Sequence, residues 1–303
     1  MIGSILVLAL FQGKPSTVAY CLPFAHKLET ELRRLGTPVT KSSIQQAVKK
    51  LGAVADAWPS WRSVFRLDRS HKFIAVFALG SYDSVAMLVT GDGKSARVKP
   101  LMMVDDDTFL PSQGFEDGSK VVVAGLVGWM GNGPSAAAAV LTPKGRTYSM
   151  ASQVSSDFEG DVTPFRFSGA SAEWQSIGRT YPKYLNVSHA MANVAMQQSY
   201  RYAKGKLTMG KARQVPNAMG ALDELAHAAA IGDRATVKRL TTTPALAQLL
   251  VGWRGALVDS GWDVPGSICS TSNTQFDSED LHRRFVFKRI HGRWTLVSAF
   301  KLP

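Results

Sequence analysis

The sequence predicts an α+β protein in three parts: an N-terminal helical pair, a central antiparallel β meander or sandwich, and C-terminal helices closed by a β-hairpin. Apolar residues recur at helical spacing over residues 23–52 and again over 186–258. Short apolar runs separated by turn residues occupy residues 64–182, and two runs with period-two alternation close the chain. We therefore expect a domain over residues 21–185 and a second over 186–303.

Composition limits the class of protein. The 303 residues are 45% hydrophobic and only 19% charged, which argues against a disordered chain and against a long coiled coil. No apolar run reaches the roughly 18 residues that a membrane span needs, so we expect no transmembrane segment. The 35 Lys and Arg residues against 23 Asp and Glu leave a formal charge of +12, which favours anionic partners.

Residues 1–20 are typical of a signal peptide, because residues 2–11 form an apolar run of the usual length. No Lys or Arg precedes the run, and no A-x-A cleavage site follows it. A β-strand buried in the core is the alternative interpretation. The first interpretation predicts a secreted or periplasmic protein, and the second predicts a cytoplasmic one.

Two helices are expected after this segment. Pro23 suits the first turn of the first helix and Gly36 its end. The second helix begins near Ser42 and ends at Gly52. The apolar stripes are Phe24, Leu28, Leu32 and Leu35 in the first helix, and Ile44, Val48 and Leu51 in the second.

The central region reads as antiparallel strands, because its apolar runs have strand length and are bounded by turn residues. The expected strands are Lys72–Leu79, Ser84–Thr90, Arg97–Val104, Lys120–Met130, Ala136–Leu141, Arg146–Ser152, Val162–Phe167 and Ala172–Tyr181.

Helices return in the C-terminal third. We expect helices over Val187–Tyr202 and over Asn217–Ile231, with Asn217 as the N-cap of the latter. Asp233 caps a short helix, and Thr243-Pro244 opens another. Strands Arg284–Ile290 and Arg293–Lys301, joined at His291-Gly292, then form the closing hairpin.

The last 85 or so residues resemble a known family. The segments that carry the resemblance are ALDELAHAAAIGDRATVKRL and RRFVFKRIHGRWTLVSAF. This order of helices and closing hairpin is similar to the SnoaL-like, nuclear-transport-factor-type α+β cone. The resemblance implies a curved sheet wrapped around helices. It leaves function open, because the family includes enzymes and non-catalytic modules.

The sequence motifs assign no catalytic residue, metal ligand or cofactor. Gly93-Lys94-Ser95 ends like a phosphate loop but lacks the earlier glycine, and a turn explains it better. Gly131-Asn132-Gly133 opens a GxGxxA pattern, but Pro143 leaves too little chain for the helix that a dinucleotide site needs. Asp105-Asp106-Asp107 lacks the order of a calcium loop and reads as a solvated loop. The two cysteines, Cys21 and Cys269, form either one disulfide or two unrelated thiols.

The clearest anomaly is charge. The segment 174–222 contains no acidic residue, and its densest cationic part lies at residues 200–213. The anion-binding candidates are Arg201, Lys204, Lys206, Lys211 and Arg213. Tyr200 and Tyr202 are candidates for stacking on a ligand.

These cations favour an exported, non-catalytic binding protein whose partner is an anionic polymer, a membrane surface or an acidic protein. An enzyme that acts on a small molecule in a pocket of the C-terminal domain is one alternative. A cytoplasmic nucleic-acid-binding protein is the other, and it requires that residues 2–11 are not a signal.

Overall fold

The computed structural model describes most of the chain. The described residues are 21–52, 61–68, 70–78, 84–104, 109–130, 133–187, 194–264 and 271–302. The predicted signal peptide, the Asp105–Asp107 run, the Gly131-Asn132 pair and Cys269 lie outside them. No helix among the described residues has both the length and the apolar character needed to cross a membrane.

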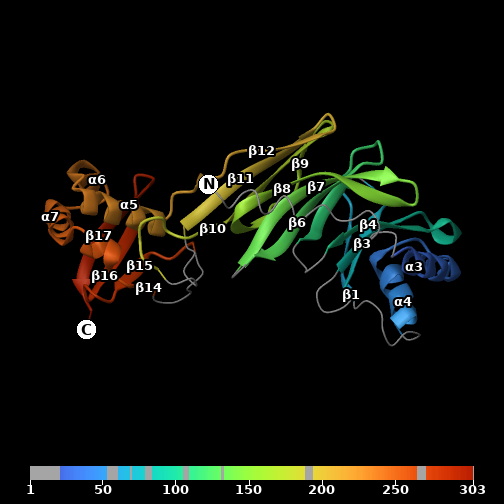
Figure 1. The fold of residues 1–303 in the computed structure, drawn as a ribbon, viewed down its shortest axis with the longest axis horizontal. Coiled ribbons are helices and arrows are strands. Elements are labelled where there is room, and N and C mark those ends of the chain that lie inside the picture. Colours follow the sequence, from blue (N-terminus) through green and yellow to red (C-terminus); the bar gives the residue numbers. More distant parts are fainter. Residues whose placement is uncertain are drawn as a thin grey trace. The chain divides into compact units, whose positions relative to one another are not determined.

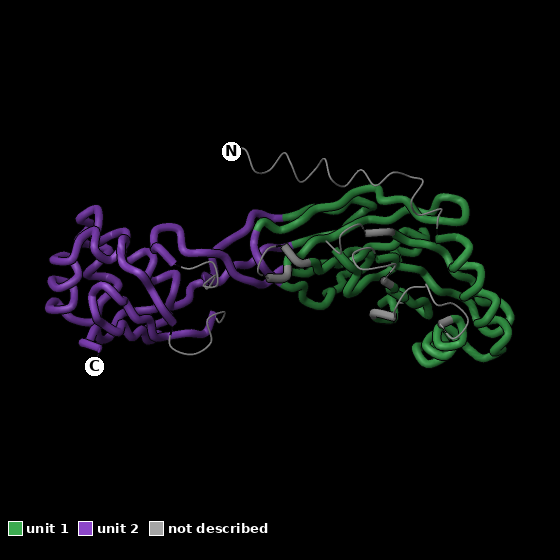
Figure 2. The backbone as a smooth tube through the Cα atoms, turned by 60° about the horizontal axis from the view of Figure 1, so that its bottom comes forward, with its two compact units in different colours: residues 1–157, 161–175, 200–209 green, residues 158–160, 176–199, 210–303 purple. Residues whose placement is uncertain are grey.

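The chain divides into two compact units (Figure 2). The first comprises residues 1–157, 161–175 and 200–209, and the second comprises residues 158–160, 176–199 and 210–303. The boundaries cut through three strands, so the division does not follow a single linker along the sequence.

Two helices and a four-stranded sheet form one side of the first unit (Figure 1). Helix α3 (Leu22–Leu35) has Pro23 in its first turn and ends at Gly36, where φ is +66°. Helix α4 (Lys41–Gly52) follows. Both pack on the sheet, and the ring of Phe24 meets Phe77 edge-on at 5.0 Å.

The four-stranded sheet is antiparallel in the order β1-β2-β3-β4. Its strands are β1 (Trp61–Arg66), β2 (Phe73–Ala78), β3 (Ser84–Thr90) and β4 (Arg97–Val104). Alternate residues of β2 point to opposite sides: Ala75 and Phe77 face the helices, and Ile74 and Val76 face a second sheet. Burial of both faces explains why β2 and β3 are nearly continuous apolar runs.

The second sheet is antiparallel and has nine strands, in the order β12-β11-β10-β8-β7-β6-β5, with β9 paired to β10 and β13 to β11. One face, including Ala137 and Ala139, packs on the four-stranded sheet, and the other, including Ala138 and Val140, packs under the aromatic residues of β10 and β11. The strands are β5 (Leu110–Glu116), β6 (Val122–Met130), β7 (Gly133–Lys144), β8 (Thr147–Val162), β9 (Arg166–Ser168), β10 (Ser171–Thr180), β11 (Val194–Ala203), β12 (Lys206–Met209) and β13 (Arg213–Gln214).

Most of the second unit is a layer of helices on a four-stranded antiparallel sheet. The core between them includes Leu222 and Leu225 from the first helix and Phe285, Phe287 and Leu296 from the sheet. The elements are α5 (Ala218–Ile231), α6 (Arg234–Arg239), α7 (Pro244–Trp253), α8 (Ala256–Asp259), β14 (Trp262–Asp263), β15 (Gln275–Ser278), β16 (Arg283–Ile290) and β17 (Arg293–Lys301).

Local signals start and end these helices. The side chain of Asn217 accepts a hydrogen bond of 3.0 Å from the backbone N–H of Gly220, and Asp233 and Thr243 cap α6 and α7 in the same way. Gly232, at φ +77°, ends α5 in the left-handed conformation that glycine adopts without strain.

The predicted α+β class is wrong, because the protein is β-rich. About 50% of the structure is strand and 26% is helix, in three antiparallel sheets. One large error is the predicted helix Val187–Tyr202, whose described C-terminal part is strand β11. Burial there has period two, since Gln198, Tyr200 and Tyr202 are buried while Arg201 is exposed.

Candidate anion-binding site

Strands β11 and β12 form a tight hairpin that carries three of the predicted anion-binding cations. Lys204 and Gly205 connect the strands, and both have positive φ, +51° and +76°. Two positive φ angles are the mark of a type I′ turn, whose twist matches that of the flanking strands. Arg201 lies on β11, Lys204 in the turn and Lys206 on β12.

The hairpin buries one of its faces. Tyr202 pairs with Leu207 across the strands, and both side chains are buried. The ring of Tyr200 stacks on Trp174 with 5.6 Å between ring centroids and 11° between planes. Tyr200 and Tyr202 are each 1% exposed, so neither ring presents a face to solvent. In this structure neither ring therefore has the face for stacking on a ligand that the sequence leads us to expect.

A hydrogen bond ties the buried face to the β5–β6 turn. The hydroxyl of Tyr202 donates to Asp117 Oδ2 over 2.5 Å. Burial works to raise the pKa of Asp117, but hydrogen bonds from the Ser119 and Tyr202 hydroxyls and from backbone N–H groups outweigh it, so the pKa lies below its ordinary value. Burial, together with this hydrogen bond, raises the pKa of Tyr202 well above its usual range. The hairpin is thus held in one position by a neutral phenol and a carboxylate.

The other face of the hairpin is open and cationic. Arg201 pairs with Thr208 and Ala203 with Lys206, so Arg201 and Lys206 lie on the same face as diagonal neighbours. Diagonal neighbours on two antiparallel strands are about 7–8 Å apart, measured between their backbone positions. Arg201, Lys204 and Lys206 are all exposed. Among the described residues, neither lysine forms an ion pair.

One carboxylate faces these cations. Glu173 on β10 pairs with Arg201, with 3.3 Å between Oε1 and Nε, and both side chains are 61% exposed. Exposed pairs of this kind contribute about 0–1 kcal/mol and weaken with salt. Arg166 on β9 stands directly opposite Glu173. Glu173 is the only acidic residue in the sequence between residues 162 and 222, so strands β9–β12 contribute no other carboxylate.

The remaining two candidates, Lys211 and Arg213, belong to the second unit. Lys211 is exposed in the segment between β12 and β13. Arg213 lies on β13, opposite Gln197, and its Nη2 donates to Gln197 Oε1 over 2.8 Å. This partner is a neutral amide, so the hydrogen bond leaves the charge of Arg213 uncompensated.

Other cations of the acid-free segment have partners. Arg179 on β10 pairs with Glu159 on β8 over 2.9 Å, and both side chains are mostly buried. Lys183 Nζ lies 4.9 Å from the centroid of the Tyr184 ring. Sequence proximity therefore overstates the free charge, because these two residues are engaged within the fold.

Sequence reasoning missed Arg166, Glu173 and Asp117 as parts of this site. The signal for the first two was present, since RFSGASAE reads as strand, turn and strand, and cross-strand pairing puts Arg166 opposite Glu173. Asp117 offered no such signal, because it lies 85 residues from Tyr202 in the sequence.

The structure also bears on three predicted motifs. Gly93-Lys94-Ser95 is one turn of 3-10 helix, in which the Ser95 hydroxyl donates to the Asp92 carbonyl and accepts from the Asp92 N–H. Ser135, where a dinucleotide-binding helix would begin, lies within strand β7. Cys21 is buried, and burial raises the pKa of its thiol to about 11. Because Cys269 lies outside the described residues, the disulfide stays a prediction.

No protein-family model matches this chain, and no curated protein matches its sequence. The SnoaL-like resemblance of the last 85 residues therefore stays a prediction. Among the described residues, no three His, Cys, Asp or Glu side chains come together as metal ligands.

Proposed function

We propose that this protein is a non-catalytic binding protein whose β11–β12 hairpin binds an extended anionic polymer. The single observation that carries the proposal is the open face of the hairpin, where Arg201, Lys204 and Lys206 are exposed and Arg201 alone has a carboxylate, Glu173, as an ion-pair partner among the described residues. With the export that residues 2–11 predict, this polymer lies outside the cytoplasm.

A polymer fits this face better than a small anion does. Arg201 and Lys206 lie on two strands about 7–8 Å apart as diagonal neighbours, and Lys204 lies in the turn that connects the strands. A repeating anion can contact several of them at once and release bound counterions from each contact. The expected signature is binding that weakens steeply as salt rises.

The β11–β12 hairpin is preorganised for binding, because its backbone is already held in place. Its buried face is anchored by the Tyr200–Trp174 stack and by the Tyr202–Asp117 hydrogen bond. A backbone that is already ordered loses little conformational entropy when a ligand binds.

Two observations weigh against the alternatives. The buried rings of Tyr200 and Tyr202 remove the stacking platform that favours a nucleic-acid-binding protein. The second observation concerns the enzyme alternative. The groove of the second unit is lined by Ala245, Gln248, Leu249, Gly252 and Trp253, and none of these side chains can act as a general acid or base.

The test compares two triple variants with equal charge. R201Q/K204Q/K206Q neutralises the hairpin, and K41Q/K49Q/K94Q removes three exposed lysines elsewhere in the first unit. Titration with a soluble sulfated polysaccharide at several salt concentrations measures the affinity of each. We expect the hairpin variant to lower the slope of log affinity against log salt by about two to three, as the loss of three contacts predicts. Equal slopes for the two variants would contradict the proposal.

A further inference from the structure

Helix α7 consists almost entirely of apolar residues, yet little of it is fully buried. Its sequence is PALAQLLVGW, and of these ten residues, all of them described, Leu250 alone is fully buried. A helix that is apolar all round is normally enclosed by protein or lipid. Here Ala245 and Gly252 are exposed, and Leu249 and Trp253 are half-buried. The outer face of α7 therefore has an apolar surface that the described chain does not enclose.

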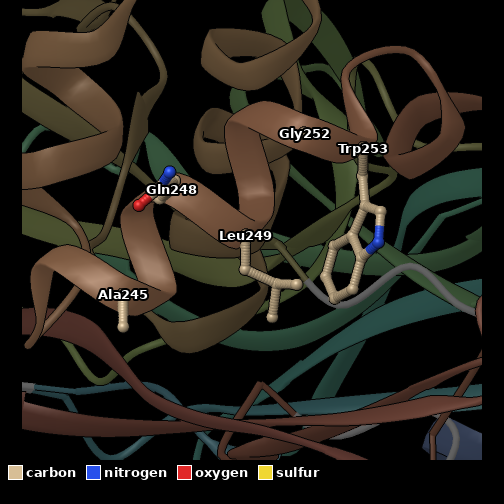
Figure 3. Close-up of a pocket in the computed structure, with 5 residues that line it drawn as sticks. All are labelled: Ala245, Gln248, Leu249, Gly252 and Trp253. Atoms are coloured by element: carbon tan, nitrogen blue, oxygen red, sulfur yellow. The ribbon is translucent and has the colours of Figure 1, made fainter.

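This surface is a stripe of four apolar residues and one glutamine. Ala245, Gln248, Leu249, Gly252 and Trp253 follow the spacing of one helix face and line an open groove of about 530 Å³. Figure 3 shows Ala245, Leu249 and Trp253 pointing to the same side of the helix. A shallow groove along one helix offers a broad apolar contact and does not enclose a small molecule.

Unpaired cations stand before and after α7. The segment 234–258 contains four Arg and Lys residues and no Asp or Glu. Arg239 is paired with Glu224, whereas Arg234, Lys238 and Arg254 are exposed and form no ion pair with the described residues. Arg234 and Lys238 lie on α6, and Arg254 follows α7 directly. The stripe is therefore flanked along the chain by exposed cations, which an anionic surface attracts.

Trp253 gives the stripe an interfacial character. Its ring packs edge-on against Phe285 at 5.8 Å, and the guanidinium of Arg283 lies 5.6 Å from its centroid. Tryptophan and arginine together are typical of the boundary between lipid headgroups and acyl chains, where one end of the indole is wet and the other dry.

We propose that α7 and the cations Arg234, Lys238 and Arg254 form a docking surface for an anionic lipid bilayer. The helix, about 15 Å long, lies in the plane of the interface with its stripe toward the acyl chains. Arg234, Lys238 and Arg254 contact the headgroups. This surface is separate from the β11–β12 hairpin, and the proposal does not depend on polymer binding.

The test uses vesicles of phosphatidylcholine and phosphatidylglycerol in equal parts, with the full chain and a flotation assay. A245E/Q248E puts two carboxylates on exposed positions of the stripe, where the fold tolerates them. We expect at least a tenfold loss of vesicle binding, with an unchanged melting curve. R234Q/K238Q/R254Q should lower binding by about one to two orders of magnitude, since each cation near an anionic surface contributes about tenfold or less.

The matched charge control is K288Q/R293Q. Lys288 and Ile290 alternate with the buried Phe285 and Phe287 on β16, and Arg293 pairs with Ile290, so the two cations lie on the face of the sheet away from the core with the helices. We expect this control and the hairpin variant R201Q/K204Q/K206Q to keep most of the vesicle binding.

Tryptophan fluorescence gives a second readout. Addition of vesicles should shift the emission of the unchanged protein to the blue, and this shift should be smaller in Trp253→Phe.

Three results would overturn the proposal. The first is vesicle binding by A245E/Q248E that equals that of the unchanged protein. The second is loss of vesicle binding in the hairpin variant while both α7 variants retain it, which would assign lipid binding to the hairpin. The third is a concentration-dependent dimer that A245E/Q248E abolishes, with no vesicle binding by the unchanged protein, which would assign the stripe to a second copy of this chain.

Discussion

The hairpin β11–β12 and the terminal hairpin β16–β17 have the same turn but use their cations differently. Lys204-Gly205 and His291-Gly292 both have positive φ at both residues. Each hairpin carries several Arg and Lys residues. In the terminal hairpin, Arg284 makes two hydrogen bonds of 2.6 Å to Asp277 on the neighbouring strand. In β11–β12, the only ion pair among the described residues is the exposed Arg201–Glu173 contact.

The difference lies in the neighbouring strand. The register of β15 puts Asp277 directly opposite Arg284, so a two-pronged bond forms. Other arginines of the terminal hairpin also bond inside the unit, as Arg283 Nη1 does to the Ala299 carbonyl over 3.2 Å. Strand β10, the neighbour of β11, offers Glu173, but its contact with Arg201 is exposed to solvent. Arg284 thus takes part in holding its sheet together, whereas Arg201 stays exposed on the open face of β11–β12.

The largest expected effect concerns the layer under the terminal hairpin. Phe285 is fully buried and contacts the rings of Trp253 and Trp262. We expect Phe285→Ala to destabilise the second unit by about 3–5 kcal/mol, because it leaves a cavity in the core. Denaturant unfolding followed by tryptophan fluorescence measures this change. A loss below about 1 kcal/mol would show that the helices do not depend on this hairpin.

Glycine substitutions compare the two turns. Gly205 has φ +76° and Gly292 has φ +80°, and in both cases an added Cβ meets no atom within 4 Å. We expect Gly205→Ala and Gly292→Ala each to cost about 1–2 kcal/mol, from backbone strain alone. Parallel thermal melts check the values. If one substitution costs much more stability than the other, the two turns are not equivalent.

Removal of the acids separates the two kinds of ion pair. Asp277 is mostly buried, whereas Glu173 is 61% exposed. We expect Asp277→Asn to lower the unfolding midpoint clearly. The difference in midpoint between this variant and the unchanged protein should shrink only slowly as the salt concentration rises. Glu173→Gln should change stability by less than about 1 kcal/mol and should strengthen polymer binding, because it leaves Arg201 free. The comparison fails if the two variants have equal effects on stability.

The smallest expected effect is a dependence of the stability of the fold on pH in the acidic range. The pKa of Asp117 is lowered in the folded protein, so its carboxylate stabilises the fold above the ordinary value of 3.8, and this contribution disappears as pH falls through the lowered value. We expect Asp117→Asn to be less stable than the unchanged protein near neutral pH and to approach it in acid. Tyr202→Phe should show a similar, weaker convergence. Thermal melts over a series of acidic buffers measure this. Parallel curves that never converge would exclude the role of the carboxylate.

Local features of the fold were predictable from short stretches of sequence. Gly36 and Gly232 end helices, Asn217 caps α5, and His291-Gly292 makes the terminal turn, as the sequence indicates. Each of these depends on a few adjacent residues, whose backbone preferences and capping bonds act over one turn. The cations Arg201, Lys204 and Lys206 were also visible as a charge anomaly.

The β-rich class, the strand at β11 and the state of each cation were not predictable in this way. Apolar residues near Val194 fit a helix or a strand, and the pairing of β11 with β10 and β12 decides between them. Whether Tyr202 faces solvent depends on Asp117 and Phe115, which are distant in the sequence and adjacent in space.

The sequence alone was therefore enough to place turns, caps and the excess of positive charge. The tertiary structure decided which cations are neutralised and which apolar faces stay uncovered. The physical reason is range: a cap or a turn is stabilised by neighbours along the chain, whereas an ion pair or a buried ring depends on strand order and register, which are properties of the whole fold.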